Sequence, residues 1–252
     1  MKIERLVSAM FNCIMSEHMK FKNTFTKKIV FAMPIITILL NIVLSHGELF
    51  QISSYNYWYA VILPGALTLV CGEVINKDIK KLKGHAILSL PIDPAKLWVS
   101  KIILCILYYF ISSVIFLIVV NLCSVIWERS ISFPSSIYGS SLIFITFLWQ
   151  IPLCLFFTYK LGTIVAILIN FPCNVVGVIL SIEPIKWIAF PYGITSRLMC
   201  PVIGVLPSSL KVPANSPLKD SSVILPGIIV SIMLFIIFST LTALWFRKKE
   251  ER

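Results

Sequence analysis

The run of residues 137–181 constrains the fold of this chain more than any other stretch. It is apolar almost throughout and contains a single charged residue, Lys160. A helix needs about 20 residues to cross a bilayer, so this run is too long for one crossing and long enough for two. The chain must turn back inside it, and Tyr159 and Lys160 followed by Gly162 form the break best suited to a turn. The sequence therefore predicts two membrane-spanning helices, at about 137–159 and 161–181, joined by a tight hairpin.

The composition extends this prediction to the whole chain. Of its 252 residues, 58% are hydrophobic and only 13% are charged, which is not the composition of a soluble domain. Further apolar runs of spanning length lie at about 29–45, 57–75, 102–126 and 223–246. At the start of the second run, Tyr55, Tyr57, Trp58 and Tyr59 are predicted to form an aromatic belt at the membrane interface. We expect an all-α integral membrane protein with six transmembrane helices.

Two segments outside these spans have apolar patterns of their own. In residues 1–28 apolar side chains recur at helical spacing, which predicts an interfacial helix followed by a six-span domain at 29–252. The alternative is a polar terminus that is periodic by chance. The outer loop 182–222 contains two short apolar stretches punctuated by proline, which we expect to form a re-entrant-like segment rather than a plain external loop. Arg197 within it is either a substrate contact or an interfacial side chain.

Lysine and arginine fall mostly on one side of the predicted topology. If the N-terminus is cytoplasmic, residues 1–28, the loop 76–101, Lys160 and residues 247–252 hold seventeen of the 22 basic residues. Cytoplasmic segments of membrane proteins carry such an excess. We therefore expect both termini in the cytoplasm. The net charge of +11 is expected to meet membrane lipids and no nucleic acid.

Motifs of common enzymes are missing from the sequence. It has no GxxxxGK[ST] phosphate-binding loop, no HExxH and no GxSxG, and its three His are scattered. Glu73 lies near the inner end of a predicted span, where a carboxylate more often pairs with lysine than catalyses. The seven Cys form no CxxC pair and are expected to be small buried hydrophobes. We expect no catalytic residue, metal site or cofactor in this chain.

Three amides lie inside the predicted fourth and fifth spans beside prolines. Gln150 precedes Pro152, and Asn170 and Asn174 flank Pro172. Polar side chains at such places satisfy backbone groups freed at kinks and hold helices together. The alternative is that these three amides line a translocation path.

The polar loop 76–101 contains features beyond the basic residues that orient a membrane protein. Its six Lys are explained by the orientation, whereas its centre is uncharged and punctuated by proline. That centre is suited to docking a soluble partner, and the alternative is a basic loop that only fixes topology. The candidate contact residues are His85, Ile87, Leu88, Ser89, Leu90, Pro91, Ile92, Asp93, Pro94 and Lys96.

Three strings carry a resemblance to a known family. They are Asn56-Tyr57-Trp58-Tyr59 leading to Leu63-Pro64-Gly65, then Ile87-Leu88-Ser89-Leu90-Pro91-Ile92-Asp93, and Ser196-Arg197-Leu198-Met199-Cys200-Pro201. Together with the order of spans and loops, they make the chain similar to the lantibiotic-immunity permeases (MutE/EpiE type), membrane subunits of ABC-2 type exporters. The resemblance covers essentially the whole chain.

The resemblance implies a heteromeric exporter in the bacterial plasma membrane. It would consist of this permease, a second related permease and two copies of a separate ATP-binding subunit that carries ATP and Mg. Such an exporter expels a lantibiotic-type antimicrobial peptide from the membrane and gives the cell immunity. The segment 85–96 would then contain the coupling helix that contacts the ATPase. The alternatives are an ABC-2 permease for another lipid, drug or peptide, and a membrane immunity protein that binds the peptide without transport.

Overall fold

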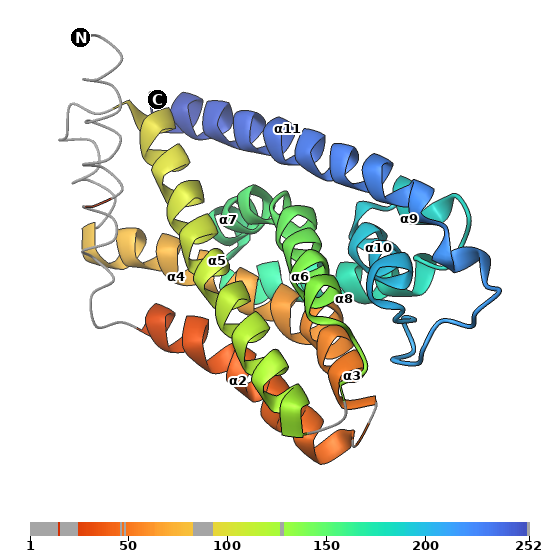
Figure 1. The fold of residues 1–252 in the computed structure, drawn as a ribbon. Coiled ribbons are helices and arrows are strands. Elements are labelled where there is room, and N and C mark those ends of the chain that lie inside the picture. Colours follow the sequence, from red (N-terminus) through yellow and green to blue (C-terminus); the bar gives the residue numbers. More distant parts are fainter. Residues whose placement is uncertain are drawn as a thin grey trace, which may run out of the picture.

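The computed structural model describes Met15 and residues 25–45, 47, 49–82, 93–126 and 129–250, and the chain within them is helical (Figure 1). The longer helices are α2 (Phe25–Leu44), α4 (Leu63–Leu82), α5 (Pro94–Ile126), α6 (Phe133–Phe147), α7 (Gln150–Leu161), α8 (Thr163–Leu180) and α11 (Ile224–Glu250). The shorter ones are α3 (Leu49–Tyr57), the π-helical η1 (Trp58–Ile62), α9 (Lys186–Ala189), η2 (Pro191–Gly193), α10 (Ile194–Ile203), η3 (Pro217–Lys219) and η4 (Ser221–Val223). Nearly all of the predicted interfacial helix at 1–28 lies outside the described residues.

Five helical segments are long and apolar enough to cross a membrane. They are Lys27–Leu44, Leu49–Lys77, Pro94–Ile126, Thr163–Leu180 and Ser221–Lys249. Helices α6 and α7 pass the same test together, as a pair bent by 41°. The described residues thus contain five to six helices of membrane-spanning character, which confirms the prediction of an all-helical membrane protein.

The bend between α6 and α7 has a local cause. Proline at position 152 has no N–H and cannot donate to the carbonyl of Leu148, four residues earlier. That carbonyl accepts instead from the N–H of Ile151, at 3.1 Å. A shorter hydrogen-bonded loop of this kind tightens the backbone and turns the axis, so the predicted fourth span is two helices rather than one.

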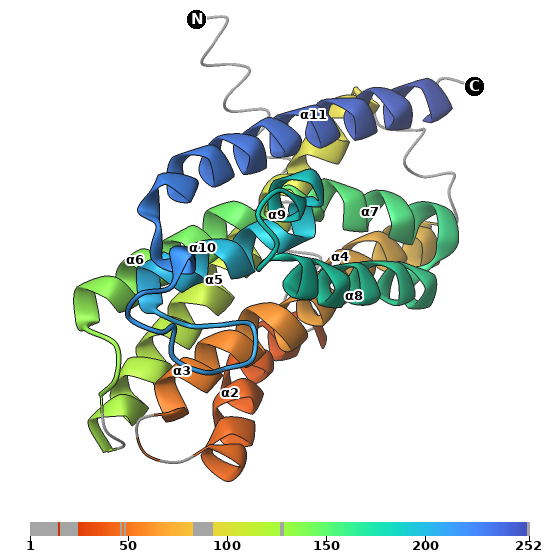
Figure 2. The same ribbon diagram turned by 90° about the vertical axis from the view of Figure 1, so that its right-hand side faces the viewer.

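Helices α7 and α8 meet at Gly162, where the sequence predicts a turn. Gly162 has φ +87°, in the region that favours glycine, and its N–H bonds to the carbonyl of Thr158 at 3.0 Å. The two helices then run side by side (Figure 2).

Helix α4 occupies the centre of the bundle and packs on α2, α7 and α8. Helix α11 crosses one side of the bundle and contacts α5, α6 and α7 (Figure 1). Near the start of α11, the short helix α10 lies beneath it and packs mainly on α6 (Figure 2). The described chain is therefore a central kinked span surrounded by other helices, with α10 filling one end.

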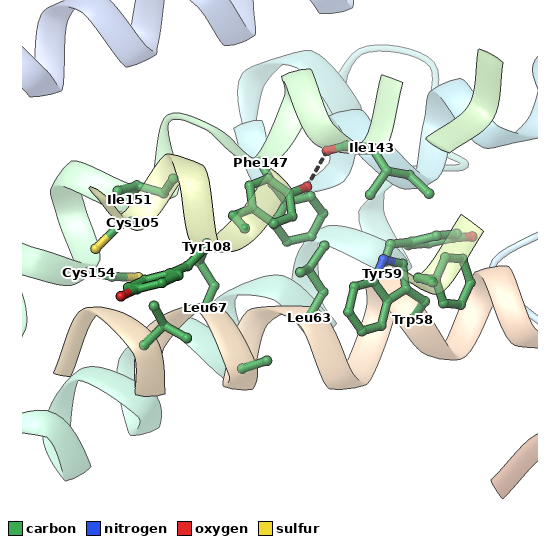
Figure 3. Packing of buried hydrophobic residues seen from close by; sticks show 14 of the residues in the cluster. Trp58, Tyr59, Leu63, Leu67, Cys105, Tyr108, Ile143, Phe147, Ile151 and Cys154 are labelled. Atoms are coloured by element: carbon green, nitrogen blue, oxygen red, sulfur yellow. Dashed lines mark hydrogen bonds between the residues drawn. The ribbon is translucent and has the colours of Figure 1, made fainter. Parts of the chain in front are cut away.

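The aromatic group before the second span is buried, so the prediction of an interfacial belt is wrong for its main members. Tyr55, Trp58 and Tyr59 are each no more than 1% exposed. Trp58 stacks on Phe116 of α5 with ring centroids 4.8 Å apart. Figure 3 shows Trp58 and Leu63 among the buried side chains of neighbouring helices. The helical segment already begins at Leu49, so these aromatic residues lie within the helix instead of at its start.

Candidate functional site

Pro64 kinks the central span and leaves backbone acceptors without helical donors. The carbonyl of Ala60, four residues earlier, receives no N–H from a proline. Just before it the backbone widens into η1, where the N–H of Leu63 bonds to the carbonyl of Trp58. Leu63 is the donor that the Tyr59 carbonyl would use in a regular α-helix. The carbonyls of Tyr59 and Ala60 therefore need a donor from outside the helix.

Asn174 supplies that donor from α8. Its Nδ2 lies 3.2 Å from the carbonyl oxygen of Tyr59 and 2.9 Å from that of Ala60. The side chain is 1% exposed, so water cannot replace it. A buried carbonyl left without a donor costs about 1–3 kcal/mol, which makes this amide a strong determinant of how α8 docks on the central span.

Asn170, one turn earlier on α8, ties four elements together. Its Nδ2 donates to Thr68 Oγ1 on α4 at 3.1 Å and to Gln150 Oε1 on α7 at 3.3 Å. Its Oδ1 accepts from the hydroxyl of Tyr192 in η2 at 3.0 Å. Asn170 and Gln150 are both 1% exposed. The network therefore connects the central span to α7, α8 and the outer loop.

The three amides predicted for a translocation path lie close together, and two of them belong to this network. Gln150 and Asn170 bond to each other, and Asn174 lies one turn further along α8. Their contacts are those of polar side chains that satisfy a kinked backbone and hold helices together. The structural interpretation accounts for each contact, and the translocation path stays a prediction.

A stripe of small and polar side chains forms the buried face of α8. Its buried residues are Ala166, Asn170, Asn174 and Gly177. A Cβ on Gly177 would lie 2.5 Å from the carbonyl carbon of Tyr192. Only glycine permits the outer loop to approach α8 this closely.

The second apolar stretch of the outer loop folds back into the protein as α10. All residues from Gly193 to Cys200 are buried. Helix α10 packs on α6, α8 and α11, and two glycines make room for it. A Cβ on Gly139 of α6 would meet the Ile203 side chain at 2.8 Å, and one on Gly227 of α11 would meet Leu198 at 2.6 Å.

Arg197 points into the protein. It is 7% exposed, and its Nη1 donates to the carbonyl of Leu218 at 2.7 Å. The guanidinium therefore holds the end of the outer loop against α10 in place of reaching toward lipid headgroups. Its predicted contact with a substrate stays a prediction.

Asn56 of α3 fixes the other part of this loop, a role that the sequence does not predict. Its Nδ2 donates to the carbonyls of Leu206 at 2.9 Å and Pro207 at 3.2 Å. These partners lie far along the chain, so no local pattern could have indicated the contact.

Most of the candidate partner-docking segment lies outside the described residues. His85, Ile87, Leu88, Ser89, Leu90, Pro91 and Ile92 belong to that part of the chain. Asp93 and Pro94 start α5: Asp93 Oδ1 accepts from the Ala95 N–H at 2.9 Å, and Pro94 is the first helical residue. Lys96 is exposed in the first turn. Helix α5 therefore begins well before the predicted third span at about 102.

Among the described residues, no group of His, Cys, Asp or Glu side chains is arranged to hold a metal ion. The six described cysteines are free, and Cys71, Cys105, Cys154 and Cys200 are buried. Comparison of the chain with protein-family models, with curated proteins and with solved structures gave no match. The candidate site is a kinked central span with α8 and α10 docked beside the kink.

Proposed function

We propose that this chain is the permease subunit of an ABC exporter that expels a lantibiotic-type antimicrobial peptide and so gives the cell immunity. The observation that carries the proposal is the burial of α10 in a bundle of apolar helices, between α8 and α11. A short helix at this point of the chain is what the sequence resemblance implies for the re-entrant segment of a six-span permease. The proposed location is the bacterial plasma membrane, with both termini cytoplasmic.

Contact between two of the three strings that carry the resemblance also supports the proposal. The hydroxyl of Tyr59 accepts from Asn56 Nδ2 at 3.1 Å and lies beside Ser196 of α10. Ser196 Oγ in turn accepts from Ser181 Oγ at 3.1 Å, at the end of α8. Strings far apart in sequence therefore meet at one place, beside the kink of the central span.

Helix α5 provides a route by which a cytoplasmic ATPase can act on this region. It runs without a break from Pro94 to Ile126 over 33 residues, about 50 Å at 1.5 Å per residue. In the proposed mechanism, two copies of a separate ATP-binding subunit contact the segment just before Pro94. A displacement there is carried along the rigid α5 to Phe116, which stacks on Trp58 beside the kink. ATP and Mg belong to that subunit, and this chain supplies the membrane path.

The proposed second permease needs a surface on which to pair. Helix α8 keeps Leu168 and Ile179 exposed on the face opposite its amide stripe, and α11 exposes Ile236 and Leu244. In the assembled exporter these apolar faces meet either lipid or the second permease. The peptide would reach the outer end of the bundle, where α10 lies next to the central span.

The test is resistance in a lantibiotic-sensitive host that expresses this chain with its ATPase and second permease. Replacing residues 88–93 by a Gly/Ser linker should abolish resistance while the chain still inserts in the membrane. The matched control replaces the exposed outer residues 213–215 and should retain resistance. Unchanged resistance in the linker variant would remove the coupling role.

Two further measurements separate the alternatives. If cells stay resistant when the ATPase carries an inactive nucleotide site, the chain binds the peptide without transport. If the ATPase co-purifies with the chain and no lantibiotic is resisted, the exporter has another lipid, drug or peptide as substrate.

A further inference from the structure

Two lysines from different helices converge on one indole ring at the end of α11 remote from α10. Lys160 Nζ, in the last turn of α7, lies 5.4 Å from the centre of the Trp245 ring. Lys249 Nζ, in the last turn of α11, lies 5.8 Å from the same ring and 4.1 Å from the ring of Tyr159. It also donates to the Tyr159 hydroxyl at 3.1 Å. The two ammonium groups are thus held over one aromatic platform.

Buried packing fixes the position of that platform. Trp98 of α5 is fully buried, stacks on Phe246 with centroids 4.7 Å apart and donates from Nε1 to Thr242 Oγ1 at 3.0 Å. Trp245 makes an edge contact with Tyr159, with centroids 5.6 Å apart. Three helices therefore meet here through aromatic rings, and the lysine positions follow from the fold.

The platform gathers positive charge that no carboxylate of the described side chains pairs with. A cation–π contact stabilises an ammonium but leaves its full charge in place. Lys186 pairs with Glu183 in the outer loop, and among the described side chains no carboxylate pairs with Lys160 or Lys249. The two helix C-termini each contribute about half a negative charge, which is less than the charge of Lys160 and Lys249 together. An anion is the ligand that complements two ammonium groups held over one ring.

The surroundings identify the anion as part of a lipid. The apolar segments that end here are Ser221–Lys249 and the bent pair α6–α7, so the ammonium groups lie where membrane-spanning length runs out. Leu241 and Leu244, exposed at 57% and 60%, line α11 within two turns of Lys248. The acyl chain of a lipid can lie along these leucines while the lipid phosphate contacts the lysines. An acidic soluble protein would not bury these exposed leucines in the same way.

We propose that Lys160 and Lys249 over Trp245 bind the phosphate group of an anionic phospholipid. The inference requires membrane-spanning helices and is independent of the proposed transport function. By the distribution of basic residues, the lipid belongs to the cytoplasmic leaflet. Its bound headgroup would join the ends of α7 and α11, which in the described chain are linked there only by side chains.

The test is native mass spectrometry of the purified full chain in detergent, titrated with phosphatidylglycerol or with phosphatidylcholine. The wild-type chain should retain phosphatidylglycerol in preference to phosphatidylcholine. In the K160Q/K249Q variant this preference should fall at least about fivefold, because each lysine near an anionic membrane surface strengthens lipid binding by about that factor. K160R/K249R should restore it. The matched control K186Q/K219Q removes the same charge from the outer loop and should keep the wild-type preference.

Three results would overturn the proposal. The first is an equal preference in wild type and K160Q/K249Q. The second is displacement of the lipid by millimolar inorganic phosphate, which would indicate a site for free phosphate. The third is that K160Q/K249Q keeps lipid preference but loses association with a cytoplasmic partner, which would make the platform a protein contact.

Discussion

The second and last apolar spans have the same length and opposite surroundings. Leu49–Lys77 and Ser221–Lys249 each contain 29 residues, yet 72% of an apolar 18-residue stretch is buried in the first and only 11% in the second. That stretch is also the less apolar in the buried span, with a mean hydropathy of 1.7 against 2.6. In a soluble protein the more apolar helix would be the central one. Here lipid takes the apolar surface, and polar groups need partners inside the bundle.

The polar side chains of the two spans show the same difference. In the central span, Asn56 and Thr68 bond to other elements, and Pro64 creates acceptors for α8. In α11, Ser231 and Thr240 bond to carbonyls of their own helix, one turn earlier. The central span is therefore specified by bonds between helices, whereas most of α11 is specified by apolar character alone. Matched substitutions in the two spans test whether they differ in this way.

The largest effect is expected for Trp58→Ala. Trp58 is 1% exposed and stacked on Phe116, so its loss leaves a cavity that costs about 3–5 kcal/mol. The matched change Leu241→Ala on α11 should cost less than about 1 kcal/mol, because lipid or detergent already contacts that side chain. Thermal unfolding of both variants in the same detergent measures the difference. Equal melting temperatures would mean that the central position of the second span is wrong.

A smaller loss is expected for Asn174→Leu. The leucine fills the space but leaves the carbonyls of Tyr59 and Ala60 without a donor, at a cost of about 1–3 kcal/mol. The control is Thr240→Leu on α11, whose hydroxyl bonds only to its own helix and which should change stability by less than about 0.5 kcal/mol. If the melting temperature of Asn174→Leu matches that of the control, the amide does not hold α8 on the kink.

The sequence predicts the positions of the apolar helices well because a bilayer imposes a length that hydropathy reports directly. The turn at Gly162 follows from the same argument, since an apolar run longer than one crossing must fold back. Burial within the bundle could not be predicted this way. Tyr and Trp are residue types typical of the membrane–water interface. Tyr55 and Trp58 lie in the core only because their helix extends back to Leu49.

The candidate site was predictable in type but not in arrangement. Prolines beside amides in the sequence indicate that side chains will satisfy kinked backbone, and Asn174 does so. However, the kink it satisfies is that of Pro64 on another span rather than that of Pro172 beside it in sequence. Pairing between distant helices depends on side-chain packing, for which one sequence holds no direct signal.

A comparison of two glycines tests how tightly α8 and the outer loop must approach. Gly177→Ala places a Cβ 2.5 Å from the backbone of Tyr192 and should cost about 1–3 kcal/mol by overpacking. Gly65→Ala on the central span meets no atom within 4 Å and should be neutral or stabilise the helix by about 0.5–1 kcal/mol. Both are measured as melting temperatures. A stable Gly177→Ala variant would show that the outer loop can move away from α8.

The smallest effect is expected just before α11, at the N-cap of η4. Asp220 accepts from the Ser222 hydroxyl at 2.6 Å and from the Ser222 N–H at 2.9 Å, and these bonds hold the pKa of its carboxyl below the ordinary value of 3.8. A lowered pKa in the folded state means that the carboxylate stabilises the fold above pH 3.8 and that this contribution disappears as the pH falls through the lowered pKa. Asp220→Asn should therefore melt slightly below wild type at neutral pH, and the two should converge in acid. Ser222→Ala removes the strongest of these bonds and should reproduce most of the pH-dependent difference. A large loss in Asp220→Asn at neutral pH would contradict the comparison of the two spans, because it would mean that the last span depends on the capped turn before α11 more than on its apolar contacts.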